Sequence, residues 1–373
     1  MKYNIDYSES ISNRGNWFRM QSLILKAIKG ENLTIGFLGG SITQGSLSST
    51  PKGCYAYLVF EWFVKNFPNS RFTYVNAGIG ATDSQFGAAR CSEDLLLTKP
   101  DFAIIEFSVN DDANDHFMET YEGLVRKVYG AKNKPATMLV HNVFYHNGGS
   151  AQVYHSRVGR HYNLPSVSMQ SSIYKEIVSG RIPNREITPD DLHPNDDGHI
   201  LVASVITNYL EKVLQSVKTG KMDAESVTLP NPITVNGYEN SILYRNYNST
   251  PELNGFAPDM SKRIDVKDCF KNGWEASKEG DSISFDVEGN SIAVQYRRTI
   301  DLPAPIARLV IDGDEEKAVI LDGNFDETWG DKLVLLTVME HDSKKKHKVV
   351  VTIIKTHEKD IKPFYLASVI GSR

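Results

Sequence analysis

The sequence predicts two domains of different class, an α/β domain with a parallel sheet and, after it, an antiparallel β-sandwich. Residues 33–216 alternate apolar strand-like runs with helical runs, a pattern typical of a parallel sheet covered by helices on both faces. After about residue 280 the apolar residues recur with period two between turns, as in an antiparallel sandwich. The length of 373 residues agrees, because roughly 150 residues make one domain.

Each element of the first domain is predicted from its own run. Apolar runs that predict strands occupy residues 33–38, 73–76, 102–107 and 137–143. Helical patterns occupy residues 54–67, 92–97, 121–128 and 200–213. We expect Pro68 to end the first of these helices and Ser92 to cap the second. The order indicates parallel strands whose carboxyl ends meet at one edge of the sheet.

The strands of the second domain are predicted from short alternating sets. These sets occupy residues 283–287, 292–296, 309–311, 349–353 and 364–366. Turn signals rich in Gly, Asn and Asp stand between them at residues 288–290, 312–314 and 322–324. A polar stretch from residue 218, followed by Pro230 and Pro232, separates the two patterns. We therefore expect a first domain at residues 1–217, a linker at 218–232 and the sandwich at 233–373.

Composition and charge exclude several classes of protein. Hydrophobic residues make up 40% and charged residues 23%, which excludes a disordered chain and a coiled coil. The chain has 41 basic and 46 acidic residues, a net charge of −5, and its one basic run, residues 344–346, is expected to be a solvated turn. Binding to nucleic acid requires clustered Lys and Arg, so we expect no nucleic-acid partner.

Membrane, secretory and cysteine signals are also missing from the sequence. No apolar run approaches the about 18 residues of a membrane span, and the first residues contain no apolar signal region, so a cytoplasmic protein is expected. Cys54, Cys91 and Cys269 are too few and too widely spaced for a disulfide framework or a zinc signature. The sequence carries no indication of an oligomeric state.

Four segments of the first domain place polar residues at strand ends or at a helix entry. Ser41 follows Gly39-Gly40 after the first strand, and the sequence NAGIGAT at residues 76–82 follows the second. Asn110 lies just after the third strand, and the sequence DDLHPN at residues 190–195 precedes the last helix. Each segment alone is common by chance. All four in this order indicate a site at the carboxyl edge of the sheet.

This set resembles the SGNH (GDSL-like) hydrolases over about residues 30–215, and most of all the bacterial carbohydrate acetyl esterases. Of the family's Ser, Gly, Asn and His positions, three match here as Ser41, Asn110 and His193. The resemblance implies a three-layer, flavodoxin-like domain and a serine hydrolase without a cofactor. Two positions depart from the pattern: the Asp of the GDSL motif is Gly40 here, and the oxyanion glycine falls on Ala81, with Gly80 beside it.

The residue types themselves supply the parts of ester hydrolysis. Ser41 is the candidate nucleophile and His193 the base that takes its proton. Asp190 stands three residues before His193, so a local turn can bring its carboxylate to the imidazole, and we prefer it to Asp191. The proposed oxyanion donors are the Ser41 N–H, the N–H of Gly80 or Ala81, and the Asn110 side-chain amide.

Other interpretations of these residues remain open in the sequence. Ser41 could only cap a helix, and Asn110 could only form an Asx-turn. Metal binding is a further alternative, although the spacing matches no known signature; its candidate ligands are Asp111, Asp112, Asp115, His116, Asp190, Asp191, His193, Asp196 and His199. The histidines at 141, 146, 155 and 161 lie in a segment that could line the cleft, but structural roles are expected for them.

A sandwich joined to such an esterase domain resembles a carbohydrate-binding module, as in the acetyl esterases that act on mannan. Trp274 and Trp329 lie in loop-like sequence, and their rings are candidates for stacking on sugars. We also expect the loop at residues 326–329 to reach over the esterase cleft. The predicted function is removal of O-acetyl groups from plant hemicellulose or its oligosaccharides, most of all acetylated mannan. The alternatives are a lipase or thioesterase of the same superfamily and a catalytically inactive carbohydrate-binding protein.

Overall fold

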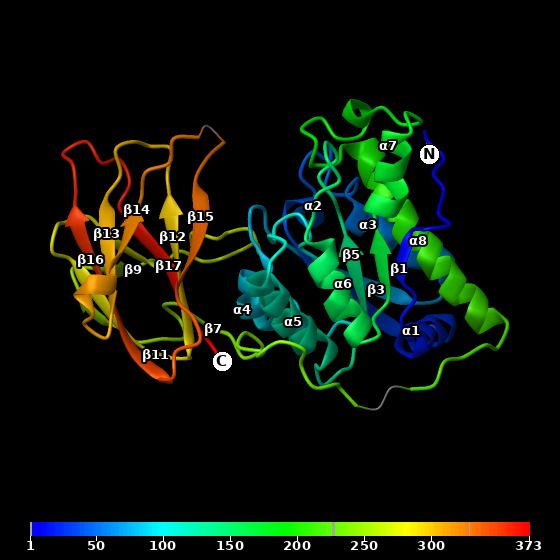
Figure 1. Cartoon of the computed structure of the whole chain (residues 1–373), viewed down its shortest axis with the longest axis horizontal. Helices are drawn as coiled ribbons and strands as arrows, with labels where there is room; N and C mark the ends of the chain where they lie inside the picture. The colour runs from blue at the N-terminus through cyan, green and yellow to red at the C-terminus, as the bar shows by residue number, and fades with distance from the viewer. Residues whose placement is uncertain (1, 226–227, 328) are drawn as a thin grey trace. The chain divides into compact units, whose positions relative to one another are not determined.

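The chain divides into two units, Met1–Asn236 and Gly237–Arg373, each with its own core. The structure is a computed structural model and describes residues 2–225, 228–327 and 329–373 (Figure 1). The first unit is an α/β fold and the second an antiparallel β-sandwich, so the predicted fold class is confirmed.

A six-stranded sheet forms the middle layer of the first unit. Its strands are β1 (Ile11–Asn13), β2 (Asn32–Gly39), β3 (Arg71–Gly78), β4 (Phe102–Glu106), β5 (Ala136–His141) and β6 (Ser166–Ser168). The order is β1-β6-β5-β4-β2-β3, with all pairs parallel except β1 on β6. The parallel strands therefore have the flavodoxin-like order. The order reverses between β2 and β4, where open α/β sheets place their ligands.

Helices cover both faces of this sheet (Figure 1). One layer contains α1 (Phe18–Ile28), α3 (Tyr55–Asn66) and α8 (Asp196–Lys218), and the other contains α4 (Ser84–Asp94), α5 (Asp115–Tyr129) and α6 (Gln152–His161). The short helices α2 (Ser41–Gln44) and α7 (Lys175–Val178) lie in the connections. No helix of the described residues is long and apolar enough to cross a membrane.

The prediction that Ser92 caps a helix is wrong. The helix α4 begins at Ser84 and contains Ser92, and its cap is Asp83, whose side chain accepts the N–H of Phe86. Residues 84–91 are buried on every side and include Gly87 and two alanines, so the helix has no apolar stripe that periodicity could reveal.

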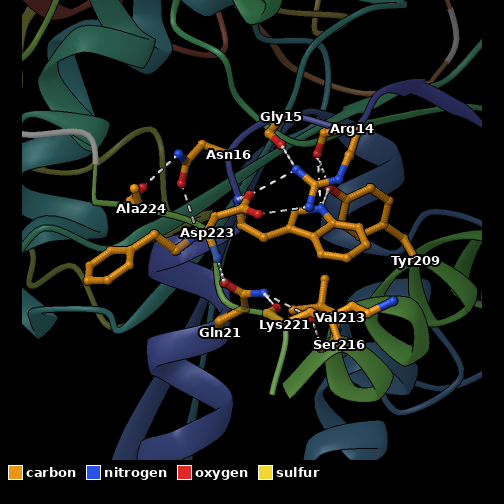
Figure 2. Close-up of polar contacts among 12 residues, drawn as sticks. Arg14, Gly15, Asn16, Gln21, Tyr209, Val213, Ser216, Lys221, Asp223 and Ala224 are labelled. Atoms are coloured by element: carbon orange, nitrogen blue, oxygen red, sulfur yellow. Dashed lines mark hydrogen bonds and ion pairs between the residues drawn. The ribbon is translucent and has the colours of Figure 1, made fainter. Parts of the chain in front are cut away.

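The segment after α8 is fixed to the first unit by polar contacts (Figure 2). The Asp223 carboxylate pairs with both terminal nitrogens of Arg14, at 2.8 and 2.9 Å, and accepts the Trp17 N–H. Gln21 accepts the Asp223 N–H and donates to the Lys221 carbonyl. These bonds occur within residues 218–232, which the sequence predicts to be a linker.

Further along, the chain is bonded to α5. Arg126 donates to the Pro230 carbonyl at 2.7 Å, and the Glu122 carboxylate accepts the N–H groups of Ile233 and Thr234, each at 2.8 Å. Residues 233–236 therefore belong to the first unit, whereas the sequence places the boundary before residue 233.

Two antiparallel sheets form the second unit. One has the order β15-β12-β17-β10-β9, with β7 beside β17, and the other has the order β14-β13-β16-β11-β8. Their strands are β7 (Ile242–Tyr244), β8 (Glu252–Asn254), β9 (Ala257–Pro258), β10 (Trp274–Ala276), β11 (Ser282–Glu288), β12 (Ser291–Arg298), β13 (Ile306–Ile311), β14 (Val319–Asp322), β15 (Lys332–Met339), β16 (Lys346–Lys355) and β17 (Phe364–Ser372). Apolar residues of period two, such as Ile283, Phe285 and Val287, fill the core between the sheets.

Candidate active site

Ser41, His193 and Asp190 form one hydrogen-bonded chain at the carboxyl edge of the sheet. The Ser41 hydroxyl oxygen lies 2.7 Å from His193 Nε2, and His193 Nδ1 lies 2.6 Å from Asp190 Oδ2. If the proton of the neutral imidazole is on Nδ1, Nε2 is free to accept from the serine. The structure therefore gathers a nucleophile, a base and a group that orients the base, as the sequence predicts.

Local structure explains how each member is presented. Ser41 is the first residue of α2, directly after β2, and is 8% exposed. Gly40 is the cap residue of α2 and no side chain caps the helix, so the role of Ser41 as a cap is not what the structure shows. His193 lies in the turn before Asn195, whose side chain caps α8 by accepting the Gly198 N–H.

Asp190, and not Asp191, orients the histidine. Asp190 Oδ1 accepts the backbone N–H groups of His193 and Leu192, at 2.7 and 3.1 Å. Burial acts to raise the pKa of Asp190, but the bonds from the His193 side chain and from these two N–H groups outweigh it and hold the pKa below its usual value. Asp191 has a left-handed backbone, with φ of 66°, and its carboxylate bonds Asn184 and Arg185 instead.

Asn110 lies against the residue that precedes the nucleophile. It follows β4, and β4 pairs with β2, so the reversal of strand order brings its loop beside Ser41. A Cβ at Gly40 would lie 2.2 Å from Asn110 Oδ1 and 2.9 Å from Nδ2. Only glycine leaves room for the Asn110 amide in this position, which explains why Gly40 occupies it. Asn110 Oδ1 is buried without a partner among the described residues, so no Asx-turn holds it.

The loop after β3 supplies the remaining candidate donors. Gly80 lies beside the nucleophile, because a Cβ there would be 3.6 Å from the Cβ of Ser41. Its N–H donates to Gln44 Oε1 at 2.7 Å. Ala81 has a left-handed backbone, with φ of 55°, and its N–H donates no hydrogen bond to any described residue. The Ala81 N–H is thus the one of the two that is available to an oxyanion.

Sequence reasoning missed Arg90, which ties together the strands that carry these loops. Its guanidinium is buried and donates to the carbonyls of Gly39, at the end of β2, and Ala77, near the end of β3. Because Ser41 follows β2 and Ala81 follows β3, Arg90 fixes the two loops relative to each other. An arginine among the small residues of α4 is the one signal that could have indicated it.

Buried polar side chains are bonded to Thr43, two residues after the nucleophile. Thr43 contacts the Tyr55 hydroxyl at 2.8 Å and donates to Glu106 Oε2 at 3.1 Å. Burial raises the pKa of Glu106 to about 7, against the opposing effect of the bond from Thr43. The sequence contained Glu106 only as part of an apolar strand.

Several of the residues weighed as metal ligands have other partners. No group of three or more His, Cys, Asp or Glu side chains in the described part of the chain could hold a metal ion. Asp196 accepts the Ser49 N–H, and His199 bonds the Tyr55 N–H and the Ser46 carbonyl, which are structural contacts. Asp111 is paired with His155 at 2.9 Å.

The remaining histidines, expected to have structural roles, differ in burial. His141 and His155 are fully buried, and His161 bonds the Asn231 carbonyl at 2.7 Å. His146 is exposed beside Phe144.

Of the two tryptophans assigned to substrate, only Trp329 is exposed. Trp274 is 1% exposed and packs edge-on against Phe285 in the core of the sandwich, so its assignment to sugar binding is wrong. It belongs to strand β10, where a large apolar ring stabilises the fold by burial. Trp329 is 55% exposed, contacts the Phe325 ring and donates from its indole nitrogen to Glu327.

Comparison with known proteins agrees with this geometry. The model of the GDSL-like Lipase/Acylhydrolase family matches residues 37–201, which contain all four motifs. No curated protein sequence matches the chain.

Among solved structures, the chain is similar to a two-domain esterase (CEX) active on acetylated mannans, crystallised with mannopentaose. The identity is 60%, the match covers 99% of this chain and 98% of that one, and the TM-score is 0.94. A second structure of a two-domain esterase described in the same words matches with the same identity and TM-score. An acetylxylan esterase from Geobacillus stearothermophilus covers 48% of this chain at 20% identity and a TM-score of 0.41, too low to bear on function.

Proposed function

Because the chain belongs to the GDSL-like lipase/acylhydrolase family, we propose that it is a serine esterase that removes O-acetyl groups from acetylated mannan or its oligosaccharides. The observation that carries this proposal is the bonded chain of Ser41, His193 and Asp190 in a protein 60% identical, along nearly its whole length, to an esterase active on acetylated mannans.

The first half of the reaction follows from the geometry. Ser41 Oγ attacks the acetyl carbonyl carbon while its proton passes to His193 Nε2, 2.7 Å away. The Asp190 carboxylate stabilises the imidazolium through Nδ1. The carbonyl electron pair moves onto oxygen, and the N–H groups of Ser41 and Ala81 and the Asn110 amide donate to that oxyanion.

The second half regenerates the enzyme. The tetrahedral intermediate collapses as His193 gives its proton to the sugar oxygen, which leaves as the free hydroxyl. The acetyl group remains on Ser41 until a water, deprotonated by His193, attacks it and acetate departs. The chemistry requires no metal or cofactor in either half.

The sandwich is proposed to assist in binding sugar. An exposed indole is suited to stack on the apolar face of a sugar ring, and Trp329 provides one. The second unit is also part of the 99% of the chain matched by the mannan-active esterase. We therefore assign Trp329 to substrate binding, and keep the carbohydrate-binding role of this unit as a proposal.

Mass spectrometry of acetylated oligosaccharides tests the function directly. Wild-type protein is expected to remove acetyl groups from manno-oligosaccharides faster than from xylo-oligosaccharides, and Ser41→Ala to remove none while keeping its fold by circular dichroism. Acetate release by Ser41→Ala would contradict the assignment of the nucleophile. Faster hydrolysis of an aryl octanoate than of an aryl acetate would favour a lipase instead.

A further inference from the structure

The carboxyl group of Asp111 is buried directly behind Asn110 and bonds two other segments of the chain. Asp111 is 5% exposed, and its N–H and that of Asn110 both donate to the Phe107 carbonyl at 3.0 Å, so the two residues share one tight turn. Asp111 Oδ1 accepts the Ser84 N–H at 2.8 Å, and Oδ2 lies 2.9 Å from His155 Nε2. A shift of this carboxyl would therefore move Asn110 with it.

The partner of Oδ1 belongs to the segment that carries the other oxyanion donor. Ser84 is the first residue of α4 and stands three residues after Ala81. The bond between Asp111 and Ser84 therefore connects the turn of Asn110 with the loop of Ala81. The Asn110 side-chain donor and the Ala81 backbone donor therefore lie in two segments that this single carboxyl joins.

The partner of Asp111 Oδ2, His155, is held rigidly. His155 is fully buried on α6 and stacks on Tyr121 of α5, with 3.6 Å between ring centroids and planes 2° apart. A stacked, buried ring has little freedom to turn, so it fixes Asp111 from a third element. Among the described residues, no hydrogen bond joins the triad to Asp111 or His155.

The charge of the Asp111–His155 pair is compatible with a position near the developing oxyanion. Burial raises the pKa of Asp111 to about 8, opposed by bonds from Ser84, and it lowers the pKa of His155 to about 3. Asp83, Asp112 and Glu106 contribute like charge around the carboxyl, and His116 opposite charge. Burial thus disfavours the charged form of both partners, which limits the negative charge that the pair places beside the oxyanion.

We propose that Asp111 is a positioning residue of the esterase, which joins the turn of Asn110 to the start of α4 and so sets the separation of the Asn110 and Ala81 donors. This inference rests on the proposed function, because it concerns the geometry of the same oxyanion site. Asp111 does not contact the substrate and acts through Asn110.

A matched pair of substitutions at Ser84 tests the bond itself. Proline is tolerated at the first position of a helix, and the preceding Asp83 is extended. Ser84→Pro removes the N–H that Asp111 accepts and also the hydroxyl, which bonds Thr120. Ser84→Ala removes the hydroxyl alone. With an aryl acetate as substrate, we expect Ser84→Pro to have a kcat about tenfold below that of Ser84→Ala, with KM equal within about twofold.

Substitutions of Asp111 test whether the effect passes through Asn110. Asp111→Ala is expected to lower kcat about 10- to 100-fold, and Asp111→Asn, which keeps a neutral acceptor for Ser84, to recover most of that loss. In the Asn110→Ala background, Asp111→Ala is expected to change kcat less than about threefold, because the donor it positions is absent.

Two controls separate this proposal from loss of stability and from failure of the proposed function. Gln21→Leu removes a buried polar side chain that donates hydrogen bonds to α8 and to the segment after it (Figure 2). It is expected to lower stability but not kcat. Equal kcat in Ser84→Pro and Ser84→Ala, or an undiminished effect of Asp111→Ala in the Asn110→Ala background, would overturn the positioning role. Should Ser41→Ala retain aryl acetate hydrolysis, the proposed function fails instead.

Discussion

The side-chain amide of Asn110 packs against the Cα of Gly40, with no space for a side chain at position 40. A Cβ there would lie 2.2 Å from Asn110 Oδ1, closer than non-bonded atoms approach. Gly40 has a φ of −87°, outside the left-handed region that favours glycine. The restriction at position 40 is steric, and it comes from the donor amide.

Gly40→Ala is therefore expected to displace Asn110 and weaken the oxyanion site. Because an oxyanion donor acts mainly in the transition state, we expect kcat to fall about 10- to 100-fold while KM changes little. Steady-state kinetics on an aryl acetate measure both constants.

The double variant provides the control. Asn110→Ala alone is expected to lower kcat by about 10²- to 10³-fold. In the Asn110→Ala background the three atoms nearest to a methyl group at position 40 are absent, so Gly40→Ala should add no further loss there. If the kcat losses of the two single variants multiply in the double variant, Gly40→Ala acts through another contact.

Neighbouring aspartates offer a second comparison, between Asp190→Asn and Asp191→Asn. Asp190→Asn removes the carboxylate that bonds His193 Nδ1 and favours the wrong tautomer, so kcat should fall by about 10³- to 10⁴-fold. Asp191→Asn loses an ion pair with the exposed Arg185 and should lower stability by less than about 1 kcal/mol with kcat within a few-fold of wild type. Steady-state kinetics and thermal unfolding of both variants test this expectation. A larger loss of kcat in Asp191→Asn than in Asp190→Asn would exclude Asp190 as the orienting group.

The main strands and the bonded triad could be predicted because each depends on local sequence. Mostly apolar runs mark β2 and β4, and a three-residue spacing is enough to bring Asp190 to His193. The switch in strand order follows from the fold class, and it places Asn110 beside Ser41.

Other features depend on contacts between distant segments and left no local pattern. The bonds of Arg90 to Gly39 and Ala77 join three elements, and the pairing of Asp111 with His155 spans two more. The strand β15 has consecutive apolar residues without alternation, so period two does not reveal it. Trp274 lies in a sequence that resembles a loop, yet the pairing of β10 with β17 places its ring in the core.

The buried Glu106 predicts a dependence of stability on pH. Its pKa is about 7 in the folded chain, above the ordinary 4.5, so the folded state keeps a proton that the unfolded state loses between these values. Its contribution to the free energy of unfolding must then fall as pH rises from 4.5 to 7, by roughly 1 kcal/mol per pH unit, and stay level above.

Glu106→Gln isolates this contribution, because glutamine keeps the shape and an acceptor for Thr43 but does not titrate. The buried His141 and His155, whose pKa values are lowered, titrate alike in both proteins and cancel in the difference. Denaturant unfolding at pH 5, 6 and 7 should show Glu106→Gln gaining stability relative to wild type as pH rises. Parallel pH curves would mean that Glu106 is ionised throughout.

Trp329 should matter for sugar polymers and not for the chemical step. Its ring is 55% exposed, and it lies in the second unit, outside the triad and the oxyanion donors. Trp329→Ala is expected to raise KM for acetylated manno-oligosaccharides about 3- to 10-fold, because a stacked ring contributes roughly 1 kcal/mol, and to leave aryl acetate kinetics unchanged. Trp329→Phe, which keeps an aromatic face, should lie between the two. If Trp329→Ala hydrolyses the oligosaccharide as fast as wild type at unchanged KM, the exposed indole has no part in recognising the substrate, and its exposure is that of an ordinary surface residue.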